Sequence, residues 1–197
     1  MATKNKEAHD AQKGNGAAKQ KDLGTMLRTD DSSATEQTSN TCISSEVKNR
    51  SGKQKLYTGR EIVDLYRSGR RDFEGIKAND AYLRGEDLWH ANLTRANLRD
   101  AYLHHADLIG ANLAGADLTW TKLACADLTF ANLSGAKLGK ADLHGANLTR
   151  ANLIGANLTR ADLEGANLTW TKLAGADLTF ANLRGAKLEG ADRLATE

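Results

Sequence analysis

The sequence predicts a repetitive solenoid over residues 71–190, because its residue types recur there with a strict period of five. Read in fives from Arg71, these residues form 24 pentads without an insertion. The middle position of each pentad, called position i, is Leu in 22 pentads, and position i−2 is Ala in 19. A period of five matches neither the 3.6-residue turn of an α-helix nor the two-residue alternation of a strand. We therefore expect Leu and Ala to point inward, and positions i−1, i+1 and i+2 to point outward.

Pentads such as ANLTR at 91–95 and ADLIG at 106–110 resemble the A(D/N)LXX motif of the bacterial and cyanobacterial pentapeptide-repeat family. The resemblance covers more than half of the chain. It implies an all-β solenoid, a right-handed quadrilateral β-helix with four pentads in each square coil and about six coils. At a strand spacing of about 4.8 Å the rod would be roughly 29 Å long. Its interior would be filled by Leu and Ala and too narrow for a ligand.

The first 55 residues differ in composition from the repeat, being rich in Lys, Gln, Ser, Thr, Asn and Gly. They lack the apolar surface needed to offset the entropy of ordering, so we expect a disordered tail. Such a tail is either a solvated leader or a partner-binding segment. The predicted organisation is a disordered polar tail at 1–55, an N-terminal capping helix at 56–70, the repeat at 71–192 and a C-terminal end at 193–197.

The capping helix is predicted from its own signals. Thr58 and Glu61 have the spacing of a capping box, and Ile62, Leu65 and Tyr66 would lie on one face of a helix. An amphipathic helix placed directly before a solenoid would shield the core of the first coil from water. The segment LYRSGRRDFEG also resembles the cap and first coil of cyanobacterial family members.

The charge is close to balanced, with a net value of +2 for the chain. Residues 1–70 carry 13 Lys and Arg against 9 Asp and Glu, and residues 71–197 carry 14 against 16. Neither half has the strong field that favours nucleic acid or an acidic membrane, so we expect no membrane association and no direct nucleic-acid binding. Cys42 and Cys125 do not make a disulfide framework, which favours a reducing cytoplasm.

An internal duplication distinguishes two sides of the predicted rod. The segment DLTWTKLACADLTF at 117–130 recurs as NLTWTKLAGADLTF at 167–180. This offset of 50 residues equals two and a half coils, so the copies fall on opposite faces. Residues 20 apart stack in columns, and the i+2 columns of these faces carry aromatic and basic residues: Trp120, Arg160 and Phe180 on one, and Phe130, Arg150 and Trp170 on the other, with Trp89 nearby.

Two interpretations of these columns stay open. Aromatic and cationic side chains one coil apart can stack, at about 0.5–1 kcal/mol per exposed pair, so the basic residues could simply cover the rings. Alternatively, the columns form a protein-contact surface, since Trp and Arg dominate binding hot spots.

Other polar constellations give weaker signals. Three aspartates in one i−1 column, Asp87, Asp107 and Asp127, suggest a cation site, but Asp or Asn at i−1 belongs to the family motif, which favours a structural role. On a neighbouring face, Asn92, Asn112, Asn132 and Asn152 can stack as an amide ladder. His105 and Cys125 share a column, yet zinc needs three or four ligands. We therefore expect no metal, cofactor or enzymatic activity.

The sequence thus predicts a non-enzymatic protein-interaction scaffold whose partner is a protein of unknown identity. The alternative, implied by the family resemblance, is a DNA mimic that binds or protects a type II topoisomerase such as DNA gyrase. The balanced charge of the repeat and the absence of interrupting loops disfavour it. At the C-terminal end Arg193 replaces Leu and no capping helix follows. We expect either an end-to-end homodimer there, or blocking by Arg193.

Overall fold

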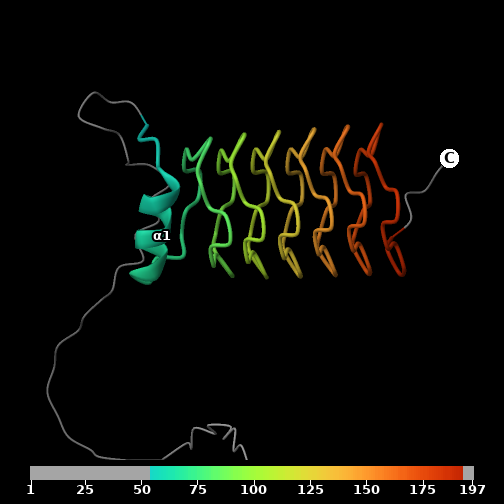
Figure 1. The fold of residues 1–197 in the computed structure, drawn as a ribbon, viewed down its shortest axis with the longest axis horizontal. Helices are drawn as coiled ribbons and strands as arrows, with labels where there is room; N and C mark the ends of the chain where they lie inside the picture. The colour runs from blue at the N-terminus through green and yellow to red at the C-terminus, as the bar shows by residue number, and fades with distance from the viewer. Residues whose placement is uncertain (1–53, 193–197) are drawn as a thin grey trace, which may run out of the picture. The chain divides into compact units, whose positions relative to one another are not determined.

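The computed structural model describes residues 54–192, in which one helix precedes a stack of coils (Figure 1). The helix α1 spans Gly59–Arg67 and contains nine residues. The predicted tail falls almost wholly outside the described residues, as does the role predicted for Arg193. Within residues 54–192 no helix combines the length and apolar character that a membrane span requires.

Helix α1 begins at the predicted capping box, which is confirmed. The backbone N–H of Glu61 donates to Thr58 Oγ1 at 3.3 Å, and the N–H of Thr58 donates to Glu61 Oε2 at 2.9 Å. The buried face of α1 includes Ile62 and Tyr66. A Cβ atom at Gly59 would overlap the carbonyl group of Tyr82, so the start of α1 lies directly against the first coil.

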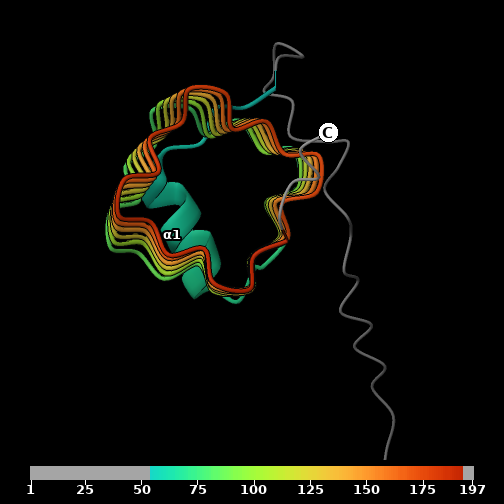
Figure 2. The ribbon, with the colours of Figure 1, turned by 90° about the vertical axis from the view of Figure 1, so that its right-hand side faces the viewer.

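The coils repeat every 20 residues, which is four pentads. Residues at position i−1 form parallel bridges with the residue 20 positions later, from Asp72–Asn92 to Asn167–Lys187. Taken four to a coil, the 24 pentads make six coils. Viewed along the stack, the coils superpose as a four-cornered ring with α1 lying across it (Figure 2). The described residues form isolated bridges instead of extended strands, because two residues of each pentad are used in a turn.

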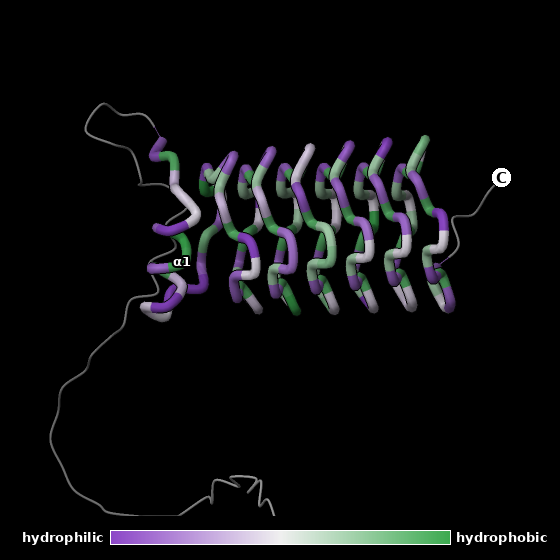
Figure 3. The backbone as a smooth tube through the Cα atoms, viewed as in Figure 1, coloured by the Kyte–Doolittle hydropathy of each residue, from purple (hydrophilic) through white to green (hydrophobic). Residues whose placement is uncertain are grey.

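The interior is filled by the residues that the period predicts. Every Leu at position i from Leu83 to Leu168 is at most 1% exposed, and Phe73 and Ala78 occupy the same position fully buried. Hydrophobic and hydrophilic segments accordingly alternate around each coil (Figure 3). Where Thr replaces Ala at position i−2, the buried hydroxyl is hydrogen-bonded: Thr121 donates to the Leu98 carbonyl at 2.9 Å and Thr171 to the Leu168 carbonyl at 2.6 Å.

Each pentad turns at position i+2, and this residue has a positive φ in all 24 pentads. The φ angles lie between 55° and 70°, whether the residue is one of 11 glycines or one of 13 other residues. The left-handed region disfavours a Cβ atom by roughly 1–2 kcal/mol. Coil closure therefore imposes this conformation on every corner, although the sequence signals it only where glycine is present.

Candidate protein-binding surface

Two opposite sides of the rod carry the duplicated segment. The first side, called the Trp120 face, consists of the stacked pentads 76–80, 96–100, 116–120, 136–140, 156–160 and 176–180. The second, called the Trp170 face, lies half a coil away and consists of pentads 86–90, 106–110, 126–130, 146–150, 166–170 and 186–190. The structure thus stacks the predicted site residues in the two predicted columns.

The corners of the four sides differ in glycine content. Position i+2 is glycine in none of six pentads on the Trp120 face, in two of six on the Trp170 face, and in four and five of six on the other two sides. Because all corners have positive φ, glycine is the unstrained residue at each of them. The Trp120 face therefore keeps a side chain at every corner in spite of the conformational cost.

On the Trp120 face the predicted cation–aromatic stacking is present. Lys140 Nζ lies 4.3 Å from the centroid of the Trp120 ring, and Arg160 Cζ lies 5.7 Å from that of Phe180. The rings are covered only in part, since Trp120 remains 40% exposed and Phe180 79%. These aromatic surfaces are accessible to a partner.

On the Trp170 face only one of the two aromatic residues of the column is covered by a cation. Arg150 Cζ lies 5.6 Å from the centroid of the Phe130 ring. The Trp170 ring instead covers the corner of the next coil, where a Cβ atom at Gly190 would lie 2.5 Å from the ring. With 58% exposure, Trp170 presents more open aromatic surface than Trp120.

Trp89 lies beside this column but serves the cap as well. Its backbone carbonyl accepts a hydrogen bond from the Tyr66 hydroxyl at 2.9 Å, and its ring centroid lies 4.9 Å from that of His90. The side chain is 46% exposed. Part of Trp89 is therefore committed to holding α1 on the first coil.

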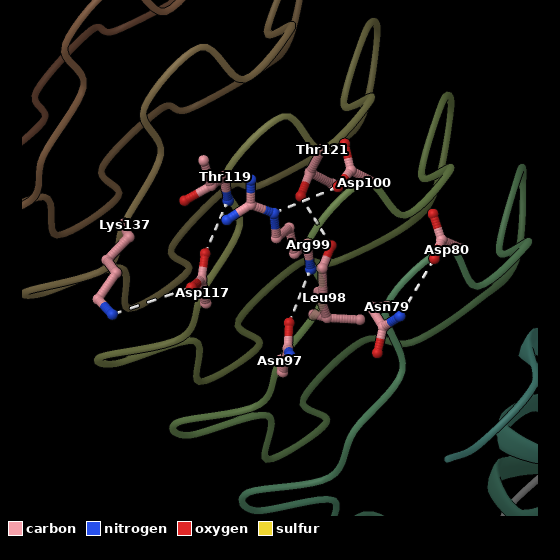
Figure 4. Close-up of polar contacts among 10 residues, drawn as sticks. All are labelled: Asn79, Asp80, Asn97, Leu98, Arg99, Asp100, Asp117, Thr119, Thr121 and Lys137. Atoms are coloured by element: carbon pink, nitrogen blue, oxygen red, sulfur yellow. Dashed lines mark hydrogen bonds and ion pairs between the residues drawn. The ribbon is translucent and has the colours of Figure 1, made fainter.

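Hydrogen bonds between polar side chains and the backbone stabilise the turns of the Trp120 face (Figure 4). Asp117 Oδ1 accepts from the N–H of Thr119 at 3.1 Å, and Asn97 Oδ1 accepts from the N–H of Arg99 at 3.2 Å. Lys137 Nζ lies 3.8 Å from Asp117 Oδ2. Partial burial opposes ionisation of Asp117, but the hydrogen bonds from Thr119 and the charge of Lys137 hold its pKa below the ordinary 3.8.

The charges on the Trp120 face are balanced and unevenly distributed. Five basic residues (Lys77, Arg99, Lys137, Lys140, Arg160) stand against four acidic ones (Asp80, Asp100, Asp117, Asp177). In the corner column the acidic residues lie in the first two coils and the basic residues in the fourth and fifth. Arg99 Nε pairs with Asp100 Oδ2 at 3.3 Å, whereas Lys140 and Arg160 make no ion pair within residues 54–192.

The aspartate column on the Trp170 face has a structural role. The Oδ1 atoms of Asp87, Asp107 and Asp127 accept backbone N–H groups two residues further on, at 3.2, 3.0 and 2.9 Å. Each carboxylate therefore stabilises its own turn. Over the described part of the chain, no group of three or more His, Cys, Asp or Glu side chains is arranged to hold a metal ion.

The predicted amide ladder forms in part. Asn132 donates to Asn112 at 3.1 Å and Asn152 donates to Asn132 at 3.2 Å. Asn92 donates to Asp72 at 2.9 Å in the same direction. Among the described residues Asn112 does not donate to Asn92, whose Oδ1 accepts from the Thr94 hydroxyl at 2.6 Å.

A groove beside α1 was not indicated by the sequence. It lies between α1 and the first coil, with Leu56, Arg60, Asp80 and Tyr82 among its lining residues. Tyr82 also stacks on Tyr102, with ring centroids 4.5 Å apart and planes 5° from parallel. The groove depends on how closely α1 approaches the coil, which residue spacing does not specify.

A family model described as pentapeptide repeats matches the chain in eight copies, over residues 79–113, 101–138, 111–150, 126–165 and 161–192. Among solved structures, the chain is similar to a pentapeptide-repeat protein (Rfr23) from the cyanobacterium Cyanothece 51142. The identity is 33%, the alignment covers 66% of this chain and 93% of that one, and the TM-score is 0.53.

A second similar structure is alr5209, a pentapeptide-repeat protein from Nostoc PCC 7120, at 34% identity over 71% of this chain and 100% of that one, with a TM-score of 0.26. QnrB1, a plasmid-mediated fluoroquinolone resistance protein, is 22% identical over 61% of this chain and 78% of that one, with a TM-score of 0.30. A search of curated proteins found no match. The matched repeats and the 20-residue coils together show that the chain belongs to the pentapeptide-repeat family, whose members adopt a right-handed quadrilateral β-helix.

Proposed function

We propose that this protein is a non-enzymatic interaction scaffold, and that the aromatic and basic columns of the Trp120 and Trp170 faces contact a protein partner. Pentapeptide-repeat proteins are generally structural or interaction proteins. The observation that carries the proposal is the set of aromatic side chains, 40–79% exposed, at corners where glycine would be unstrained. A rigid coil fixes these rings in place, so little side-chain entropy is lost when a partner binds.

The topoisomerase alternative has less support. A mimic of DNA presents a dense acidic surface, whereas the Trp120 face carries five basic and four acidic residues. A DNA supercoiling assay with purified gyrase tests it directly. We expect neither inhibition nor protection at micromolar protein.

We also propose an end-to-end contact with a second copy and a location in a reducing compartment. The last coil leaves the N–H groups of Leu178 and Leu183 without a backbone acceptor among residues 54–192, which supports an end-to-end contact with a second copy. Cys125 is an exposed free thiol, which supports a reducing compartment such as the cytoplasm.

The test of the scaffold proposal is affinity capture from native cells with Trp120→Gly and Trp170→Gly baits. Glycine is the residue that the fold already uses at 11 corners, so these variants remove the ring without straining the backbone. We expect recovery of the partner to fall about tenfold or more, as for a hot-spot residue. Arg95→Gly, at an equivalent corner of another side, is the matched control and should leave recovery unchanged. If all three baits recover the same proteins as the wild type, the two tryptophans are not a binding surface.

A further inference from the structure

We propose that the Trp120 face binds the same face of a second copy of this chain in antiparallel orientation. The inference rests on the proposed function of this face as a protein-binding surface and names its partner. The twofold axis would lie in the interface, perpendicular to the two rods, between the third and fourth coils. In such an isologous contact, each surface patch faces its own copy.

This symmetry determines which residues meet. Each column of the Trp120 face would lie opposite the same column of the second copy, running in the other direction. The first coil of one copy therefore faces the sixth coil of the other, the second faces the fifth, and the third faces the fourth. Every pair occurs twice, once on each side of the axis.

The i−1 column is self-complementary in this register. Lys77 of one copy faces Asp177 of the other, and Asp117 faces Lys137. Asn97 faces Asn157, and two amides can exchange hydrogen bonds. Lys77, Lys137 and Asp177 are exposed, and the existing contact of 3.8 Å between Lys137 and Asp117 leaves room for a second partner.

The corner column is complementary in the same register. Asp100 faces Arg160, and Trp120 faces Lys140, while Asp80 faces Phe180. Lys140 already lies over Trp120 of its own chain, and in the dimer it would lie between two indole rings. The i+1 column adds only neutral or singly charged pairs, such as Arg99 opposite Thr159. The whole face therefore forms three opposite-charge pairs in each half of the interface and no like-charge pair.

The other three sides do not match themselves as well under the same operation. The Trp170 face gives one opposite-charge pair, Asp87 with Lys187. The side with Asp72 and Lys172 also gives one. The remaining side pairs Lys122 with Asp142 but places Arg84 opposite Arg184. Only the Trp120 face combines three opposite-charge pairs and no like-charge pair with a side chain at every corner.

The charges that would cross the interface are available. Arg160 makes no ion pair within the described residues, and Asp100 contacts only the exposed Arg99. Exposed ion pairs are individually weak and screened by salt. We therefore expect a weak dimer that forms in low salt and dissociates as the salt concentration rises.

The experiment is sedimentation velocity on the full chain over a range of protein and salt concentrations. Arg160→Asp would place carboxylates opposite Asp100, and we expect the dimer to weaken about tenfold or more. Asp100→Arg should act similarly. The double variant restores opposite charges across both contacts and should recover the dimer. Asp tolerates positive φ, so the corner itself is not disturbed.

Arg95→Asp is the matched control, since Arg95 occupies an equivalent positive-φ corner on another side. It should leave the dimer unchanged. A wild-type chain that stays monomeric at several hundred micromolar in low salt would overturn the proposal. So would a dimer that neither single substitution weakens, or single variants that the double variant does not rescue.

A zero-length carbodiimide cross-link gives a second, independent measurement. Lys77 and Asp177 lie five coils apart within one chain, about 24 Å, so they can be joined only between chains. We expect a Lys77–Asp177 cross-linked peptide from the dimer. Its absence, with a dimer linked through the last coil instead, would show an end-to-end assembly and refute the lateral one.

Failure of this inference can be told apart from failure of the scaffold proposal. A monomeric rod that still loses its cellular partner on Trp120→Gly or Trp170→Gly refutes self-association alone. Unchanged capture with both glycine variants refutes the scaffold proposal, whatever the sedimentation result.

Discussion

The two ends of the solenoid have the same repeat but different surroundings. At the N-terminal end, α1 covers the first coil, and Phe73 and Leu88 are fully buried. In the last coil, Leu188 occupies the same column as Leu88 but is 44% exposed. A Leu at position i is therefore not buried by the repeat alone. Its burial requires a neighbouring element on both sides of its coil.

The backbone hydrogen bonds do not show the same difference between the two ends. Leu168, in the fifth coil, donates its N–H to the Lys187 carbonyl at 2.7 Å in the coil that follows. Among residues 54–192, the N–H groups of Leu178 and Leu183 have no such acceptor. The first coil also has N–H groups without a backbone acceptor among these residues, such as those of Asp72 and Tyr82. The two ends therefore differ in the burial of their side chains and not in the presence of open donors.

The largest expected effect comes from the same Leu→Ala substitution made at each of the two ends. Leu88→Ala should lower the free energy of unfolding by about 3 kcal/mol, because it leaves a cavity in a fully packed coil. Leu188→Ala should lower it by less than about 1 kcal/mol, since the exposed side chain contributes little and the last coil can fray on its own. Urea unfolding of both variants measures this. Equal losses would mean that the last coil is as well packed as the first.

An intermediate effect is expected from the helix cap. Thr58→Ala removes the acceptor of the Glu61 N–H and should lower the free energy of unfolding by about 1 kcal/mol. Thr58→Ser keeps the hydroxyl and is the control, with a loss of a few tenths at most. Chemical unfolding monitored by circular dichroism compares them. A loss in the serine variant as large as in the alanine variant would exclude the hydroxyl as the cause.

The smallest expected effect is a dependence of the stability on pH, which comes from Glu61 at the N-terminal end. Hydrogen bonds from Lys55 and Thr58 lower the pKa of Glu61 from 4.5 to about 2. The pKa of Glu61 is lower in the folded state than in the unfolded state. The ionised carboxylate therefore stabilises the folded state above pH 4.5, and this stabilisation is lost as the pH falls toward 2. Glu61→Gln should therefore unfold with a shallower dependence on pH between 4.5 and 2. Parallel curves for the two proteins would show that Glu61 does not contribute.

The packing of the solenoid interior could be predicted from the sequence more completely than the conformation of its corners. The five-residue period assigned the inward positions, and the capping box located the start of α1 at Thr58 and Glu61. The positive φ of Trp120 and Phe180 could not be read from residue type, since aromatic residues do not favour it. It is imposed by closure of the coil. Similarly, Trp170 turns toward Gly190 and away from Arg150, because glycine leaves space at that corner.

The offset of 50 residues between the duplicated segments has a consequence for the number of partners that one assembly could hold. A duplication of whole coils would have placed both copies on one face, whereas two and a half coils place them on two opposite faces. The two copies of the segment point in opposite directions and are displaced by about 12 Å along the axis. With the Trp120 faces joined in a dimer, the two Trp170 faces would point outward from the assembly. Because these two faces point away from each other, a compact partner could not contact both of them, and one dimer would instead join two partner molecules.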